Sequence, residues 1–465
     1  MFKEKQATLH RWPRTRLYQR STSRCARVTA VLCLVLGTFH WISVIHSHRK
    51  ALVAKFNPTI FTHLTPWDSS TIADTHWRWN ETQDFTWGLY SRREIWANRH
   101  EWKRLGSGSE GETFTYNGTV IKVYKTAKFP FRNCVPDAPS GLRWPTEIEA
   151  SLLLGGMAGD KNRRDGEFLP VTDYFMSPPE EGEARWHFLT PFLASGSLVR
   201  LAEHLHHSGH AYTAHDLDTI YRPSLERLFE ALDRMHNRHG LCHDDVKPDN
   251  IFLSGKGSLR EADETLDVTK DWMLADLGNA REPHHQYHSS ILWSRLNNNL
   301  PDCRINDVVR LVKSYMLFLR AAVEDGGAFD EQFFQGREPW ARLFWSIVNG
   351  VNSDTVSAVS ARVLSMALDP SLEDPNDTLV HGRDPQGLWN PVKRLLMSRE
   401  EVISRGVDDQ LRIRLVYHDG HYHPDPAQSE QRHGSRSGWL WQRIYEFWDH
   451  ILYGVGSVYY KIRGR

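Results

Sequence analysis

The sequence predicts an α+β domain that follows an N-terminal transmembrane helix, and three observations favour this class. Residues 113–124 form two runs of alternating polar and apolar residues around an Asn-Gly pair, which is typical of a β-hairpin. Residues 225–235 repeat Leu, Phe and Met at helical spacing, which predicts an amphipathic helix. Residues 28–48 contain no Lys, Arg, Asp or Glu, and an uncharged stretch of this length is typical of a membrane-spanning helix.

The uncharged stretch is predicted to be a type II signal anchor. Its 21 residues would form a helix of about 31 Å, close to the hydrocarbon thickness of a bilayer. Residues 1–27 carry eight Lys or Arg and one acid, Glu4, so the positive-inside rule predicts a cytosolic tail and a lumenal domain in the secretory pathway. A cleaved signal peptide is the alternative, because the purely apolar part, residues 28–39, is short.

The rest of the chain divides into three parts. Residues 49–98 are rich in Trp and are predicted to form a stalk that packs on the domain, residues 99–385 the α+β domain, and residues 386–465 a C-terminal extension. Residues 439–453 predict an amphipathic aromatic helix, which would either dock on the domain or lie in a membrane interface. Equal numbers of basic and acidic residues, 57 of each, give no sign of nucleic-acid binding.

A glycine-rich turn lies at the start of the domain. The pattern G-x-G-x-x-G lacks side chains where backbone N–H groups would have to approach phosphates. In the second strand of the hairpin, residues 119–124, Val120-Ile121-Lys122 resembles the V-A-I-K strand of protein kinases, which implies that Lys122 faces the same phosphates. The candidate nucleotide-binding residues are therefore Gly106, Ser107, Gly108, Gly111 and Lys122.

An acidic partner for Lys122 is expected on a helix at residues 146–154. Glu147 and Glu149 compete for this role. The resemblance to protein kinases favours Glu149, because in that family the glutamate precedes an apolar pair three and four residues on, about one helical turn away, as Leu152 and Leu153 follow Glu149 here.

An apolar run at residues 186–193 predicts a further strand that leads out of the sheet. This run resembles the last strand of the small lobe and the hinge of protein kinases, which implies that Thr190 lies near an adenine ring. The backbone of Leu193 would contact the edge of that ring, since Pro191 has no N–H to offer.

The strongest motif is the stretch from His243 to Asn250, followed 26 residues later by Asp276-Leu277-Gly278. Phosphoryl transfer needs a carboxylate for the acceptor hydroxyl, a cation beside the transferred phosphate and oxygen ligands for Mg²⁺. Residues with these chemistries are Asp245, Lys247, Asn250 and Asp276.

These motifs, taken in order, resemble those of eukaryotic-type protein kinases, which read H-R-D-L-K-P-x-N and D-F-G. The resemblance implies a two-lobe protein kinase-like fold that uses ATP and Mg²⁺, and a buried helix whose Asp307 braces the loop. It implies these roles: catalytic residues Asp245, Lys247, Lys122 and Glu149, and metal ligands Asn250 and Asp276. Lys247, two residues after Asp245, is typical of serine/threonine-type loops, so a protein Ser or Thr is the expected acceptor.

Three departures separate the chain from the family pattern. Asp244 replaces Arg, Leu277 replaces Phe, and no A-P-E sequence occurs between Asp276 and Asp307. An acid at position 244 would repel a phosphate, so activity is not expected to require phosphorylation of Tyr287, Ser289 or Ser290. The architecture is also similar to that of secretory-pathway kinases, including the protein O-mannose kinase family, some of which phosphorylate sugars. A glycan kinase and a catalytically weak pseudokinase that binds a partner therefore stay as alternatives.

Five cysteines are too few for a disulfide framework. Cys242, beside the loop, and Cys303, shortly before Asp307, are compatible with one bridge or with two buried thiols.

The topology can be tested on protein in intact vesicles. Added protease should remove only a short N-terminal tail, and glycosidase should shift the mobility, because Asn80, Asn117 and Asn376 are N-x-Thr acceptors. Complete digestion without a mobility shift would place the domain in the cytosol instead.

Overall fold

The computed structural model describes residues 15–61, 92–108, 111–124, 145–159, 166–177, 185–255, 270–297, 300, 302–351, 355–370 and 397–413. The chain forms two compact units, residues 1–53 with 426–465, and residues 54–425. Each unit is described by itself.

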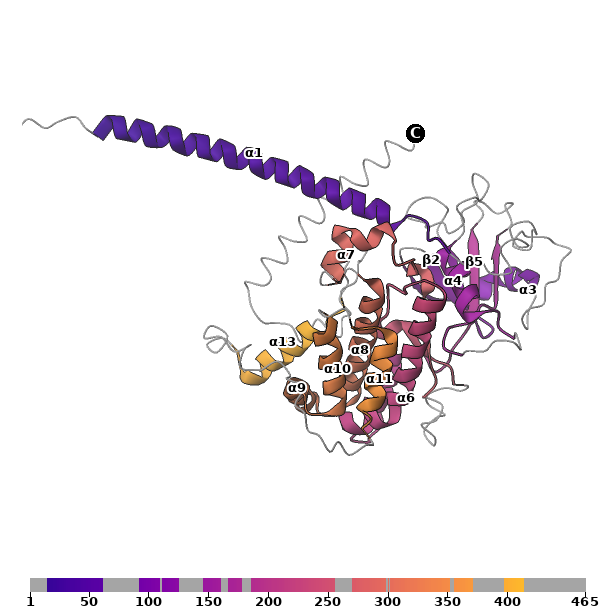
Figure 1. Cartoon of the computed structure of the whole chain (residues 1–465). Coiled ribbons are helices and arrows are strands. Elements are labelled where there is room, and N and C mark those ends of the chain that lie inside the picture. Colours follow the sequence, from indigo (N-terminus) through magenta and orange to yellow (C-terminus); the bar gives the residue numbers. More distant parts are fainter. Residues whose placement is uncertain are drawn as a thin grey trace, which may run out of the picture. The chain divides into compact units, whose positions relative to one another are not determined.

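The first unit contains most of a long helix, α1 (Thr15–Lys55) (Figure 1). Ala26–Lys55 is long and apolar enough to cross a membrane, and large apolar side chains such as Leu34 and Phe39 are exposed along it. The helix includes the predicted residues 28–48 and extends beyond them at both ends. The predicted helix at 439–453 lies outside the described residues.

The second unit begins with a five-stranded antiparallel sheet. Its strands are β1 (Lys103–Ser107), β2 (Gly111–Tyr116), β3 (Thr119–Tyr124), β4 (Asp173–Met176) and β5 (Trp186–Pro191), in the order β1-β2-β3-β5-β4. The predicted hairpin is confirmed: Tyr116 pairs with Thr119, and Asn117 and Gly118 both have positive φ, of 49° and 73°. Two central residues of positive φ are what a two-residue hairpin turn requires.

Two helices lie in the same part of the chain as the sheet, one before β1 and the other between β3 and β4. In α3 (Arg92–Ala97), Ile95 is buried with Ile121, Phe175 and Leu189, and the Trp96 ring lies 5.3 Å from that of His187. The last residues of the predicted stalk therefore pack on the sheet, whereas residues 62–91 lie outside the described part of the chain. The other helix, α4 (Thr146–Gly155), carries Glu147 and Glu149.

Helices make up most of the remaining part of this unit (Figure 1). They are α5 (Leu198–His207), α6 (Ala214–Asp233), α7 (Ile291–Leu296), α8 (Cys303–Ala322), α9 (Gly326–Gln335), α10 (Pro339–Gly350), α11 (Ala358–Ala367) and α13 (Arg399–Leu411). The amphipathic pattern before the loop is confirmed, because Leu225, Leu228 and Phe229 on α6 are fully buried. The residues described thus form a mixed α+β fold with a sheet-rich N-terminal lobe.

A small ladder joins the two parts. β6 (Ile251–Leu253) pairs with β7 (Trp272–Leu274), and Phe168, in the segment before β4, bridges to Leu274. Short 3₁₀ turns flank the ladder, η5 (Pro248–Asn250) before β6 and η8 (Leu277–Asn279) after β7. Two predicted site residues flank this ladder, Asn250 just before β6 and Asp276 shortly after β7.

A buried ion pair on α6 provides a test of the helical core. Arg222 contacts Asp218 at 2.7 Å, both side chains are almost fully buried, and Arg222 also donates to the carbonyls of Ser365 and Leu368. Arg222→Met should lower the free energy of unfolding by about 3 kcal/mol, because it leaves the Asp218 charge buried without its cation.

The matched control is Arg405→Met, which breaks another i,i+4 pair, with Glu401, on the exposed face of α13. It should cost less than about 0.5 kcal/mol. Denaturant unfolding of the detergent-solubilised chain measures both. Equal losses would contradict the assignment of Arg222 to the core.

Candidate functional site

The loop that precedes β6 is held by one buried carboxylate. Asp307, on α8, accepts hydrogen bonds from the backbone N–H groups of His243 at 2.7 Å and Asp244 at 3.0 Å. Its side chain is fully buried, and Nε2 of His236 lies 3.1 Å away. Asp307 therefore braces the loop, as expected from the sequence.

Asp245 lies at the centre of a small polar cluster. The ammonium of Lys247 donates to its Oδ2 at 3.0 Å, and Nδ2 of Asn250 donates to its backbone carbonyl at 2.9 Å. Arg310 lies 3.5 Å from Oδ1. The loop thus brings together three residues that the sequence predicted. Arg310, on α8, joins them, although the sequence analysis gave it no role. Its position could have been inferred from the spacing to Asp307, because residues three apart share one face of a helix.

The β6–β7 ladder brings Asp276 beside this cluster. The backbone N–H of Ala275 donates to the carbonyl of Asn250 at 2.9 Å, so the two predicted metal ligands lie at the same end of the antiparallel ladder, Asn250 just before β6 and Asp276 shortly after β7. Asp276 has φ 58°, in the left-handed region that non-glycine residues rarely adopt. Backbone strain of this kind is commonly found at functional sites.

Lys122 on β3 completes the group from the side of the sheet. Its ammonium contacts the carboxylate of Glu147 and lies 3.6 Å from Oδ1 of Asp276. The preference for Glu149 is therefore wrong, because Glu147 forms the ion pair. The two glutamates are two positions apart on α4, and residues at that spacing do not share a helix face. Tyr124, also missed by the sequence analysis, donates its hydroxyl to Glu147.

The electrostatics of these groups are coupled. Burial would raise the pKa of Asp276, but the charges of Lys122 and Lys247 outweigh it and hold that pKa below its usual value. Burial would lower the pKa of Lys247, and the carboxylates of Asp245 and Asp276 raise it instead. The pKa of Glu147 is raised, because burial outweighs the opposing effect of Lys122. Near neutral pH the cluster thus keeps a charged carboxylate and a charged ammonium side by side.

The glycine-rich turn shows two different uses of glycine. A Cβ on Gly111 would lie 2.4 Å from the carbonyl oxygen of Val123, so the pairing of β2 with β3 requires a glycine there. Gly106 and Gly108 have no described atom within 4 Å of such a Cβ, and they are exposed together with Ser107. The backbone N–H of Gly108 donates to the carbonyl of Gly111 at 2.8 Å, which closes the turn. Residues 109 and 110 lie outside the described part.

The two residues predicted to contact adenine lie at the end of β5. Thr190 is buried and pairs with Val120, two positions from Lys122 and therefore on the same face of the sheet. The carbonyl of Leu193 accepts a hydrogen bond from the N–H of Gly196 at 3.0 Å, so one of its two backbone groups is already engaged.

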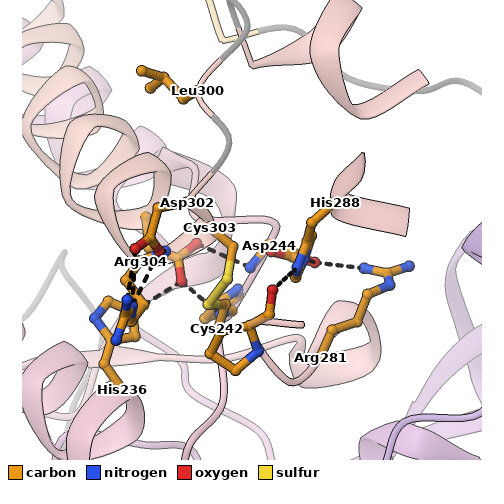
Figure 2. Close-up of a disulfide and its surroundings, with 12 residues drawn as sticks. His236, Cys242, Asp244, Arg281, His288, Leu300, Asp302, Cys303 and Arg304 are labelled. Carbon is orange, nitrogen blue, oxygen red and sulfur yellow. Dashed lines mark hydrogen bonds and ion pairs between the residues drawn. A yellow bond between two sulfur atoms is a disulfide. The ribbon is translucent and has the colours of Figure 1, made fainter. Parts of the chain in front are cut away.

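A disulfide joins the loop to α8. Cys242 and Cys303 are bonded, so the structure contains the bridge and not two buried thiols (Figure 2). Cys242 directly precedes His243, and Cys303 is the first residue of the helix that carries Asp307. The bridge and the Asp307 hydrogen bonds therefore fasten the same two elements.

Comparison of the sequence with protein-family models and with curated proteins finds no match to either.

The correction on α4 gives a test. Glu147→Gln should lower the affinity for Mg·ATP, the ligand expected from the sequence, about tenfold, because Lys122 loses its charged partner. Glu149→Gln, a matched change on the same helix, should leave the affinity within about twofold. Calorimetric titration of the solubilised chain measures both. A larger effect at Glu149 would contradict the pairing.

Proposed function

We propose that this protein is an ATP- and Mg²⁺-dependent kinase that transfers the γ-phosphate of ATP to a hydroxyl, and that the acceptor is a Ser or Thr of a protein. The two-lobe protein kinase-like fold is part of this proposal. The α+β architecture, with a sheet-rich lobe before a helical part, is compatible with it.

One observation carries the proposal: residues from four separate segments converge on one place. Lys122 on β3 contacts both Glu147 on α4 and Asp276 after β7, while Asp245 and Lys247 lie on the loop before β6. The acidic, cationic and amide groups named for phosphoryl transfer from the sequence thus share one cluster, although they lie up to 154 positions apart in the chain.

The residues present also fit Mg²⁺. Carboxylate and carboxamide oxygens are the ligands that this ion prefers, and Asp276 and Asn250 offer one of each from adjacent strand ends. Because Nδ2 of Asn250 donates to Asp245, its carbonyl oxygen is the atom left to bind a cation. A bound ion would neutralise charge on the phosphates.

The remaining roles follow from the contacts. Asp245 would accept a hydrogen bond from the acceptor hydroxyl and orient its oxygen, and Lys247, 3.0 Å away, would balance negative charge at the transferred group. Lys122, held by Glu147, would bind the phosphates of ATP. The backbone at Gly106–Gly108 and the end of β5 would hold the nucleotide from the side of the sheet.

Two observations support a lumenal domain on a type II anchor. Disulfides persist in oxidising compartments, and the Cys242–Cys303 bridge lies inside the proposed site. Asn117 of the Asn117-Gly118-Thr119 acceptor is exposed at the tip of the hairpin, where a glycan can be accommodated. A lumenal domain would meet secretory proteins and their glycans, so a sugar hydroxyl stays the alternative acceptor.

Two substitutions separate an enzyme from a binding scaffold. Asp245→Asn should reduce kcat at least about 100-fold with little change in ATP affinity, because it removes the group that orients the acceptor. Asp276→Asn should weaken Mg²⁺-dependent ATP binding itself. Labelled ATP with separate protein and glycan acceptor pools measures transfer, and calorimetry measures binding.

Equal transfer by the wild type and both variants would refute the kinase assignment. ATP binding without transfer to either pool would favour the pseudokinase.

A further inference from the structure

The segment after Asp276 is attached to the loop by an ion cluster whose charges are the reverse of those in phosphorylation-switched kinases. The side chain of Asp244 on the loop is fully buried and contacts two groups of the segment, the guanidinium of Arg281 at 2.9 Å and Nε2 of His288 at 2.8 Å (Figure 2). In those kinases the loop supplies a cation and the segment supplies a phosphate. Here the loop supplies the anion and the segment supplies the cations.

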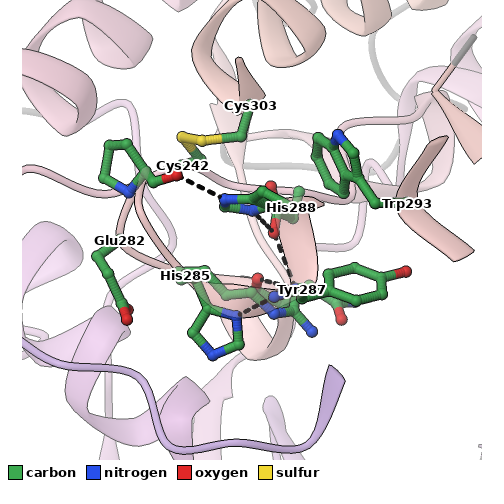
Figure 3. Close-up of polar contacts among 12 residues, drawn as sticks. Cys242, Glu282, His285, Tyr287, His288, Trp293 and Cys303 are labelled. Atoms are coloured by element: carbon green, nitrogen blue, oxygen red, sulfur yellow. Dashed lines mark hydrogen bonds and ion pairs between the residues drawn. A yellow bond between two sulfur atoms is a disulfide. The ribbon is translucent and has the colours of Figure 1, made fainter. Parts of the chain in front are cut away.

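Both cations are fixed by further contacts. Nδ1 of His288 lies 2.9 Å from the carbonyl of Pro283, and its ring lies against that of Trp293 (Figure 3). Arg281 also donates to the carbonyl of Asn279 at 2.7 Å and lies over the Tyr287 ring at 4.6 Å. An acceptor at each ring nitrogen favours the doubly protonated imidazolium. The Asp244 contacts are therefore charge-assisted hydrogen bonds in a buried place, the kind that is strongest.

The backbone reinforces the same attachment. Cys242 and Arg281 exchange two hydrogen bonds, with N–H to carbonyl distances of 2.7 and 3.0 Å, as an isolated antiparallel bridge. Cys242 is also the disulfide partner of Cys303 on α8. The segment is thus attached to the part of the loop that the helix already holds.

Residues that follow α1 complete the attachment. The hydroxyl of Thr59, a fully buried residue, donates to the carbonyl of Ala280 at 2.8 Å. The N–H of Ile60 donates to Glu282 at 3.1 Å, and the carbonyl of Lys55 accepts from Arg281 at 3.2 Å. Residues 55–60 therefore lie alongside residues 280–282, which also pair with the loop at Cys242.

We propose that Arg281 and His288 are positioning residues, which hold the segment after Asp276 in its working arrangement through Asp244, and that residues 55–60 are part of the same clamp. The proposal rests on the proposed function, because the segment begins at the metal ligand Asp276. The clamp takes the place of a phosphate, so the segment is ordered without modification. It also makes the stretch next to the membrane helix part of the site's support.

The contact between Asp244 and His288 should weaken as the pH rises. Burial would lower the pKa of His288, but the charge of Asp244 and the Pro283 carbonyl raise it above its usual value. Burial would raise the pKa of Asp244, and His288 and Arg281 instead lower it to about 2. Among the described residues, Arg281, Glu282, His285 and Tyr287 are further charged or titratable groups near His288. A raised folded pKa means that the His288 contact contributes fully below about pH 6.5 and is lost as pH rises through the folded pKa.

Hydrogen exchange of the full-length, detergent-solubilised chain tests the clamp without requiring catalysis. His288→Gln and Asp244→Asn should speed exchange of the amides of residues 279–290 at least about tenfold, while α8 stays protected. Thr59→Val, a nearly isosteric change, should speed exchange around Ala280 about threefold. Ser289→Ala, an exposed position in the same segment, is the control and should change nothing.

The pH profile distinguishes positioning from general stability. After correction for intrinsic rates, wild-type protection of the segment should fall as the pH rises through the raised pKa of His288, and His288→Gln should remove that step. Unchanged exchange in both cluster variants, or an unchanged step, overturns the proposal. If a cluster variant also loses protection in α8 it has unfolded, and Thr59→Val then decides: unchanged exchange around Ala280 overturns the proposal. Hydrogen exchange uses no ATP, so its result tests the clamp even if the kinase assay shows no activity.

Discussion

The buried carboxylate of Asp307 is the constraint on which the proposed site depends. It accepts the backbone N–H groups of two consecutive loop residues, His243 and Asp244. Two bonds to neighbouring amides hold the backbone there, where Asp244 has φ 63°. The side chain of Asp244 then meets Arg281 and His288, while Asp245, the next residue, meets Lys247. One buried acid thus separates the roles of two adjacent acids, and its charge-assisted hydrogen bonds offset the backbone strain.

Features with a local cause could be predicted from the sequence. The Asn117-Gly118 turn fixed the hairpin, because few other pairs accept positive φ at both positions. The helical spacing of Leu225, Leu228 and Phe229 identified α6, because a buried helix needs an apolar stripe. Separate roles for Lys122, at the phosphates, and Asp276, at the metal, were predicted only through the family resemblance, since no spacing in the chain joins residues so far apart.

Features that depend on orientation or on distant partners could not be predicted. The choice of Glu147 over Glu149 depends on the rotation of α4 about its axis, which the apolar positions did not determine, because both glutamates are buried. The ion cluster at Asp244 needs Arg281 and His288 to fold back on the loop, and each of them is unremarkable in sequence. The contact of Thr59 with Ala280 spans 221 positions and uses one hydroxyl, so no local pattern announces it.

The attachment of Thr59 limits how far the proposed site can lie from the membrane. If α1 spans a bilayer, only ten residues, 49–58, lie between His48 and Thr59, so these two residues can be at most about 40 Å apart even at full extension. The proposed site would then stay close to the membrane surface. Near that surface, acceptors carried on membrane-bound molecules would have a high effective concentration, and freely diffusing ones would not. The short connection through residues 49–58 would thus favour membrane-bound acceptors of the proposed reaction, independently of the shape of any binding pocket.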